Sequence, residues 1–177
     1  RRSVLICHQF VCAGGQLPET CDSELVSVGG SDQVDCSIFD GFDYVALGHL
    51  HRPQRMGRDT VRYAGSPLKY SLSEVNHVKS LPLVTLGEKG RVEVQLIPLH
   101  PARDLRRIRG ELEAILAAGR LETEGRNDYI WAQLEGEPGL DPAERLRLLY
   151  PNLIHVETVA ATAPDEEDGI SSPILEN

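Results

Sequence analysis

Two short apolar runs, each followed closely by a histidine, stand out in the pattern of hydrophobic and polar positions. The first occupies residues 4–7 and is followed by His8. The second occupies residues 44–47 and is followed by Gly48 and then His49. A continuous apolar run of this length is typical of a strand that is buried on both faces. The pattern therefore predicts two buried strands that each deliver a histidine at the carboxyl end.

The remaining part of the first hundred residues alternates between polar and strand-like stretches. Residues 11–35 are rich in Gly, Ser and Asp and predict a long loop, which in a compact domain is more often functional than incidental. Residues 58–62 predict a polar turn and a short strand. Residues 79–86 and 91–99 alternate enough to predict two paired strands, joined by a hairpin loop at residues 87–90.

A second pattern, after about residue 100, mixes strand-like and helical spacing. Leu105 and Ile108 fit a strand or a helical turn, and Gly110 favours the strand. Asp141 and Pro142 predict a helix start, with Asp as cap and Pro at the first helical position. This β-α-β-α-β order predicts a small two-layer α/β module. Its other expected elements are a helix at 111–118 ended by Gly119, a strand at 128–134 and a last strand at 153–159.

Composition narrows the class of protein. The chain has 177 residues, 41% hydrophobic and 25% charged, which is ordinary for a globular protein. It has no apolar run of the roughly 18 residues that a membrane span needs. The four cysteines form no C-x-x-C pair, so we expect free thiols, a cytoplasmic location and no structural zinc.

The net charge of −9 argues against a generic nucleic-acid binder. Phosphate contacts are local, however, so the position of the charges matters more than their sum. Residues 52–69 carry five basic side chains against one acid, Asp59. This stretch is either a solvated loop or a surface that meets a phosphate backbone.

The spacing of His49 and His51 indicates a metal site. In an extended backbone, residues two apart point the same way, and neutral imidazole is the commonest metal ligand in proteins. Loops after buried strands are where α/β folds place their sites. With His8 at the end of the other strand, three imidazoles converge. The alternative is a turn with two surface histidines, and we expect His77, His100 and His155 to be structural or surface residues.

Longer motifs surround these histidines. They are HQF at residues 8–10 with GG at 14–15, SVGGSDQVD at 27–35, FDYVALGHLHRPQ at 42–54, RYAGSPLKYSLSE at 62–74 and YPN at 150–152. Together they resemble the SbcD-type exonuclease subunits, which are calcineurin-like metallophosphoesterases and bacterial relatives of the nuclease that acts in double-strand-break repair. The similarity runs almost continuously from Val4 to about Glu157.

This resemblance implies an α/β fold with three parts. Residues 1–99 would form the carboxyl-terminal half of a metallophosphoesterase β-sandwich core, 100–160 a small two-layer α/β capping domain, and 161–177 an acidic flexible tail. The chain opens at Arg1 without a methionine. We therefore expect the family's amino-terminal Asp-x-His, bridging Asp and Asn-His-Asp motifs to lie outside this chain.

The resemblance also implies the chemistry. The parent protein would be a DNA exonuclease that hydrolyses phosphodiesters with two manganese ions and acts in DNA repair and recombination. His8 and His49 would bind one ion and His51 the other, and the catalytic histidine would lie in the part outside this chain. We expect the chain alone to be inactive and to bind manganese weakly.

The expected partners follow from the same family. They are double-stranded DNA, an SbcC-like ATPase subunit and a second copy of the full-length protein, with no membrane. The candidate DNA-binding residues are Arg52, Arg62, Tyr63, Ser66 and Lys69, although the last three could instead pack a turn. Two other functions remain open: a small-molecule phosphoesterase of the same superfamily, and a non-catalytic scaffold that binds DNA or a partner.

Overall fold

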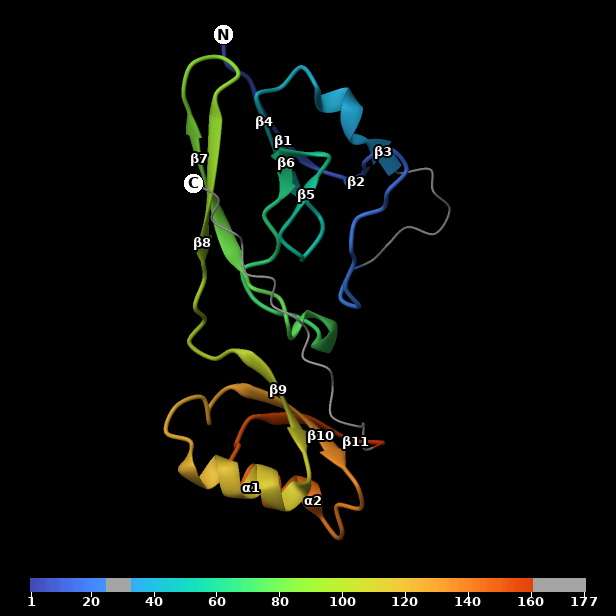
Figure 1. The fold of residues 1–177 in the computed structure, drawn as a ribbon, viewed down its shortest axis with the longest axis vertical. Helices are drawn as coiled ribbons and strands as arrows, with labels where there is room; N and C mark the ends of the chain where they lie inside the picture. Colours follow the sequence, from blue (N-terminus) through green and yellow to red (C-terminus); the bar gives the residue numbers. More distant parts are fainter. Residues whose placement is uncertain (25–32, 161–177) are drawn as a thin grey trace, which may run out of the picture. The chain divides into compact units, whose positions relative to one another are not determined.

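The computed structural model describes residues 1–24 and 33–160. The chain forms two compact units, Arg1–Arg106 and Arg107–Asn177, which Figure 1 shows in sequence colours. The domain boundary predicted after residue 99 lies between the strands β8 and β9 defined below, and it stays a prediction. The tail predicted at 161–177 lies outside the described residues. The architecture is mixed and rich in sheet, with few helices, as an α/β fold requires.

The first unit is built on a four-stranded sheet whose strand order is β1-β4-β6-β5. β1 pairs with β4 in parallel, β4 with β6 in parallel, and β5 with β6 antiparallel. The two strands predicted to precede the histidines are β1 and β4, and both are confirmed. The four strands are β1 (Val4–His8), β4 (Tyr44–Gly48), β5 (Gln54–Met56) and β6 (Arg58–Tyr63).

β4 and β1 differ in how deeply they are buried. Tyr44, Val45 and Leu47 of β4 are all buried. β1 alternates instead, and its Ile6 side chain is 81% exposed. The prediction that β1 is buried on both faces is therefore wrong for this structure. One face of β1 packs on the core through Leu5, while the described residues place no second layer over the other face.

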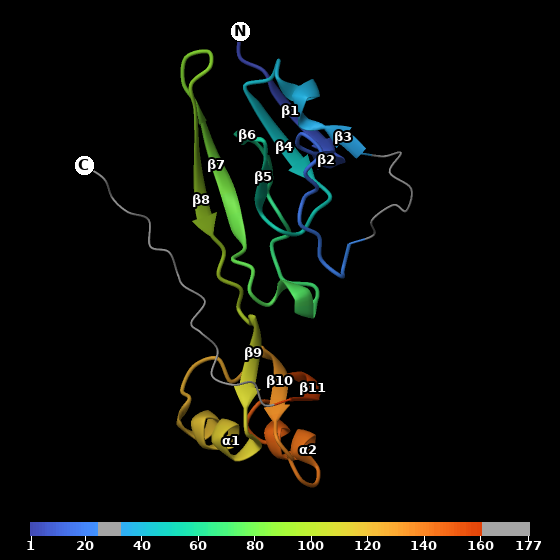
Figure 2. The same ribbon diagram turned by 45° about the vertical axis from the view of Figure 1, so that its right-hand side comes forward.

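Shorter elements complete the first unit. The stretch predicted as a loop contains β2 (Phe10–Cys12) and β3 (Gln33–Asp35), which pair in parallel, and its residues 25–32 lie outside the described part. β7 (Ser80–Leu86) and β8 (Val92–Pro98) form the predicted antiparallel hairpin. Figure 2 shows this hairpin beside the main sheet. Two short 3-10 helices lie at Cys36–Phe39 and Leu72–Glu74.

The core of the first unit is organised around Tyr63. Its ring is completely buried, its hydroxyl donates to the Gln9 carbonyl at 2.7 Å, and the Val11 N–H donates to the same oxygen at 2.8 Å. β6 is thereby attached to the chain just beyond β1. The other buried members are Val11, Phe39, Val45, Leu47, Leu50, Met56 and Val61.

The second unit is the predicted β-α-β-α-β module. Its sheet has the order β11-β10-β9, with β10 and β11 parallel, and both helices cover one face (Figure 2). Ile130, Ala132 and Leu134 alternate along the central strand and are all buried against the helices. The elements are β9 (Leu105–Gly110), α1 (Leu112–Leu121), β10 (Tyr129–Glu135), α2 (Pro142–Arg147) and β11 (Leu153–Val159).

Two local predictions in this unit are wrong. Gly119 does not end α1, which continues to Leu121. A Cβ at Gly119 would lie 2.7 Å from the Tyr150 hydroxyl oxygen, so glycine is needed there for close packing rather than for a helix stop. Asp141 stands at the cap position of α2 in a left-handed conformation and makes no side-chain capping hydrogen bond.

Two further sequence predictions concern the cysteines and the membrane. Cys7, Cys12, Cys21 and Cys36 are all free thiols, as predicted. Among the helices of the described residues, none has the length and apolarity needed to cross a bilayer.

The core of the second unit provides a stability test. Leu134 is completely buried, whereas Leu148, at the end of α2, is 85% exposed. Leu134→Ala removes buried methyl groups and leaves a cavity, so we expect it to lower the free energy of unfolding by about 2 to 5 kcal/mol. The matched control Leu148→Ala is expected to change it by less than about 0.5 kcal/mol. Urea unfolding followed by circular dichroism measures both; equal losses would contradict the placement of this core.

Candidate metal centre

His8 and His49 come together at one edge of the main sheet. His8 is the last residue of β1 and lies opposite Gly48, the last residue of β4, and His49 follows directly. Because the two strands run in parallel, their carboxyl ends meet at the same edge. The His8 Nε2 and His49 Nδ1 atoms are 3.2 Å apart, and the ring planes meet edge to face with centroids 5.1 Å apart.

The backbone around this pair is specialised. His49 has φ of 108°, a conformation that a residue with a side chain rarely adopts. Strain of this kind costs of order 1 to 3 kcal/mol and is concentrated at functional sites. Gly48 is needed for a different reason: a Cβ there would lie 3.0 Å from His8 Nδ1. The turn therefore brings the two imidazoles together at a local energetic cost.

His51 contacts a different set of groups. Its Nδ1 atom lies 2.8 Å from the Ser23 hydroxyl and 3.5 Å from Glu74 Oε1, and its ring meets Tyr70 edge to face at 5.4 Å. Its backbone N–H donates to the Glu24 carboxylate. The His51 side chain is 25% exposed. The structure therefore brings two of the three predicted ligands into contact and fixes the third through its neighbours.

Behind His51 lies a buried ion pair. Glu74 has no exposed surface, and Lys79 Nζ donates to its Oε2 at 2.6 Å. Ser23 Oγ donates to Glu74 Oε1 at 2.7 Å, and Ser71 Oγ donates to the same oxygen at 3.1 Å. Lys79 also donates to the His51 carbonyl at 2.8 Å. Both charges are hydrogen-bonded as well as paired, which is what makes their burial tolerable.

The surroundings of Glu74 set its protonation state. Burial alone would raise its pKa, because a carboxylate loses solvation when water is excluded. The hydrogen bonds from Lys79 and Ser23, together with the charge of Lys79, outweigh burial and lower the pKa from 4.5 to about 2. Glu74 is therefore a carboxylate throughout the physiological range.

A second group of metal-ligand residues lies beside this pair. Ligand atoms of Cys21, Glu74 and His77 lie within 4.8 Å of one another, although no sequence motif indicates a role for His77. Residues of these types can hold a metal ion. The Lys79 ammonium already occupies the cation position next to Glu74, and burial, with the nearby Glu24 charge, raises the pKa of the Cys21 thiol to about 12. These features favour a structural role.

The structure corrects two of the predicted DNA-binding residues. Tyr63 and Ser66 are buried, and the Ser66 hydroxyl donates to the Leu68 carbonyl at 2.7 Å. Their hydroxyls are therefore used inside the protein and not offered to a phosphate backbone. The sequence could not reveal this, because a hydroxyl residue in a turn suits either role.

The three basic candidates differ in how freely they are presented. Arg52 is 42% exposed and pairs with Glu19 on the surface. Arg62 lies on β6 and is partly buried. Lys69 Nζ donates to Asp104 at 2.9 Å and has little exposed surface. Arg52 is the most accessible of the three.

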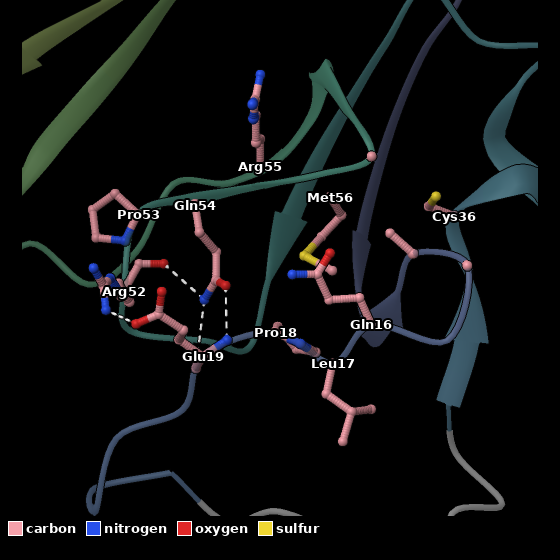
Figure 3. Close-up of a pocket in the computed structure, with 13 residues that line it drawn as sticks. Gln16, Leu17, Pro18, Glu19, Cys36, Arg52, Pro53, Gln54, Arg55 and Met56 are labelled. Carbon is pink, nitrogen blue, oxygen red and sulfur yellow. Dashed lines mark hydrogen bonds and ion pairs between the residues drawn. The ribbon is translucent and has the colours of Figure 1, made fainter.

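Arg52 also borders a surface hollow of about 710 Å³, which Figure 3 shows. Gln54 holds one wall by pairing with the backbone of Glu19, accepting from its N–H at 2.9 Å and donating to its carbonyl at 2.8 Å. The other lining residues come from segments 13–18 and 53–57, with Cys36. No histidine lines this hollow within the described part of the chain, so it is separate from the metal centre.

Comparison with known proteins identifies the family. Residues 101–172 match the model SbcD_C, described as the type 5 capsule protein repressor C-terminal domain. Over 159 residues the chain is 33% identical to the SbcD subunit of the nuclease SbcCD from Staphylococcus epidermidis. The chain belongs to the SbcD-type family. The alignment covers 89% of this SbcD-type chain but 41% of that relative, so the chain spans about two fifths of the relative's length. The relative's name describes one component of a nuclease.

Sequence reasoning missed the groups that surround His51 in the SbcD-type chain. Ser23 lies in a stretch with no periodicity, and Lys79 falls at the start of a predicted strand. Glu74 did carry a signal, because Ser71 and Glu74 have the S-x-x-E spacing of a capping box. In the structure both Ser71 Oγ and the Tyr70 N–H donate to Glu74 Oε1, so the spacing marks a real local contact.

The buried carboxylate predicts a pH dependence. A carboxyl whose pKa is depressed on folding adds stability above its unfolded pKa, and that stability is lost as pH falls through the folded value. For Glu74 the loss begins near pH 4.5 and continues through pH 2, amounting to on the order of 3 kcal/mol. Urea unfolding at a series of pH values measures it. Glu74→Gln should be less stable at pH 7 and lose less on acidification; parallel curves for the two proteins would contradict the assignment.

Proposed function

We propose that this chain supplies the histidine side of a two-metal phosphodiesterase centre in a DNA nuclease subunit. His8 and His49 are ligands of one divalent ion and His51 is a ligand of the other. The observation that supports this most directly is the 3.2 Å separation of His8 Nε2 and His49 Nδ1 at the carboxyl ends of two parallel strands.

This separation suits two ligands of one ion. Nitrogen ligands about 2.1 Å from a metal, at angles between octahedral and tetrahedral, lie about 3.0 to 3.4 Å apart. The two imidazoles can therefore share an ion without rearranging the strands. The strained backbone of His49 supports the same proposal, because it holds the ring in place before any ion binds.

The chemistry follows from what such a centre provides. Two divalent ions lower the pKa of a water molecule and neutralise the charge that develops on the phosphate. The residues of this chain orient that centre: the ends of β1 and β4 fix His8 and His49, and the Glu74 network fixes His51. We propose manganese as the metal, since a mixture of imidazole and oxygen ligands suits ions of this class.

The complete centre needs carboxylates as well. Within residues 1–24 and 33–160, the group that brings three metal-binding atoms together is Cys21, Glu74 and His77, whereas His8 and His49 form a pair. We therefore propose that the parent protein has a metallophosphoesterase core to which this chain contributes one part. Alone, the chain binds manganese weakly and does not hydrolyse DNA.

The proposal extends to partners. The similarity to a component of SbcCD supports an SbcC-like ATPase as partner of the parent protein, double-stranded DNA as substrate, homodimerisation and a cytoplasmic location. On this chain, Arg52 is the best placed of the predicted DNA contacts, with Arg62 and Lys69 as weaker candidates because more of their surface is covered.

Manganese binding tests the proposed centre. His49→Ala removes one of two adjacent ligands, so we expect manganese affinity to fall by at least about tenfold. His155→Ala removes an exposed histidine of the second unit and should leave affinity unchanged. Electron paramagnetic resonance of free Mn²⁺ measures both. If the chain binds manganese and His49→Ala binds it equally well, the assignment is wrong.

DNA binding tests the basic surface. Removing one lysine or arginine that contacts a phosphate reduces the slope of log affinity against log salt concentration by about 1. We expect this reduction for Arg52→Ala with a double-stranded oligonucleotide, measured by fluorescence anisotropy. Arg145→Ala makes the same charge change at a residue paired with Glu113 and serves as the control. Equal slopes for all three proteins would exclude Arg52 as a contact.

A further inference from the structure

We propose that Glu74 is a positioning residue that acts through Ser23 to hold His51 in one tautomer, with Nδ1 protonated and Nε2 free to bind a metal. This inference deepens the proposed function, because it takes His51 as a metal ligand. Glu74 itself touches the ring at 3.5 Å, and the Ser23 hydroxyl stands between them with shorter contacts to both.

The tautomer follows from counting protons. Glu74 faces the Lys79 ammonium at 2.6 Å, so its carboxylate accepts hydrogen bonds and donates none. A serine hydroxyl has a single proton, and Ser23 donates that proton to Glu74 Oε1 at 2.7 Å. The Ser23 oxygen must then accept at its other contact, which is His51 Nδ1 at 2.8 Å. The proton of the neutral imidazole is therefore on Nδ1.

This arrangement leaves the lone pair on Nε2, the ring nitrogen that faces away from Ser23. A histidine that binds a metal through one nitrogen usually donates its other N–H to a carboxylate, carbonyl or water, which fixes the ring orientation. Here the serine hydroxyl passes on the influence of the carboxylate. The geometry thus assigns Nε2, and not Nδ1, as the ligand atom of His51.

Glu74 also fixes the backbone of the same histidine. Lys79, held by Glu74, donates to the His51 carbonyl at 2.8 Å, and the Ser66 N–H donates to that carbonyl at 3.0 Å. A Cβ at Gly65 would lie 2.8 Å from the same oxygen, so the chain passes too close there for a side chain. One buried carboxylate therefore controls His51 at both its ring and its main chain.

The test measures the tautomer directly in the metal-free chain. Long-range ¹H–¹⁵N NMR spectra of the imidazoles distinguish a protonated Nδ1 from a protonated Nε2. We expect the Nδ1–H form for His51 in the unaltered chain. Ser23→Ala removes the acceptor and should shift His51 toward the Nε2–H form, while Ser23→Thr keeps a hydroxyl and should restore the original tautomer.

Ser71→Ala is the matched control. Ser71 Oγ donates to the same Glu74 oxygen, at 3.1 Å, so this variant also removes one hydroxyl from the carboxylate but leaves the Ser23–His51 contact in place. It should retain the Nδ1–H form. Because all three substitutions are conservative, the test does not depend on Glu74→Gln, which would leave the Lys79 charge buried without its partner.

Mn²⁺ titration of the same proteins provides a second readout. Ser23→Ala should weaken manganese binding by about 10- to 100-fold, and Ser71→Ala by less than about twofold. A protonated Nε2 in the unaltered chain, or an unchanged tautomer in Ser23→Ala, would overturn the inference. If the tautomers behave as expected but the unaltered chain binds no manganese, the role of Glu74 in positioning the ring is upheld and the metal assignment fails instead.

Discussion

The parallel pairing of β1 with β4 is the constraint on which the candidate site depends. Its register places His8 opposite Gly48, so the two strands end together and the next residue, His49, turns back over the end of β1. A shift of one residue would point the His8 side chain to the opposite face of the sheet. The hydrophobic pattern of β4, which is buried on both faces, holds the register against such a shift.

The sequence was sufficient for the elements with a strong local pattern. The strands before His8 and His49, the hairpin of β7 and β8, and the α/β order of the second unit all follow from apolar spacing and from glycine or proline at the boundaries. Elements set by distant contacts could not be found in this way. β2 and β3 are three residues each and exist because they pair across a polar stretch, and α1 passes through Gly119 because Tyr150 packs there.

The site shows the same division. Histidine spacing identified the candidate ligands, because two strand ends and one loop were visible in the pattern. The groups that orient His51 come from three separate stretches of the chain, around Ser23, Glu74 and Lys79. No spacing rule links them, since their association is produced by burial of an ion pair. Likewise Tyr63 and Ser66 had the right chemistry for phosphate contacts, and only their burial shows that they serve the interior.

The exposed face and free edge of β1 affect how the chain behaves in solution. Val4 and Ile6 present branched aliphatic side chains to water, and β1 is the outermost strand of its sheet, with β4 on one side. An edge strand of this composition is a template for adding a strand from another molecule. Concentrated samples are consequently prone to self-association through β1, and the substitution Ile6→Lys would act as a gatekeeper against it.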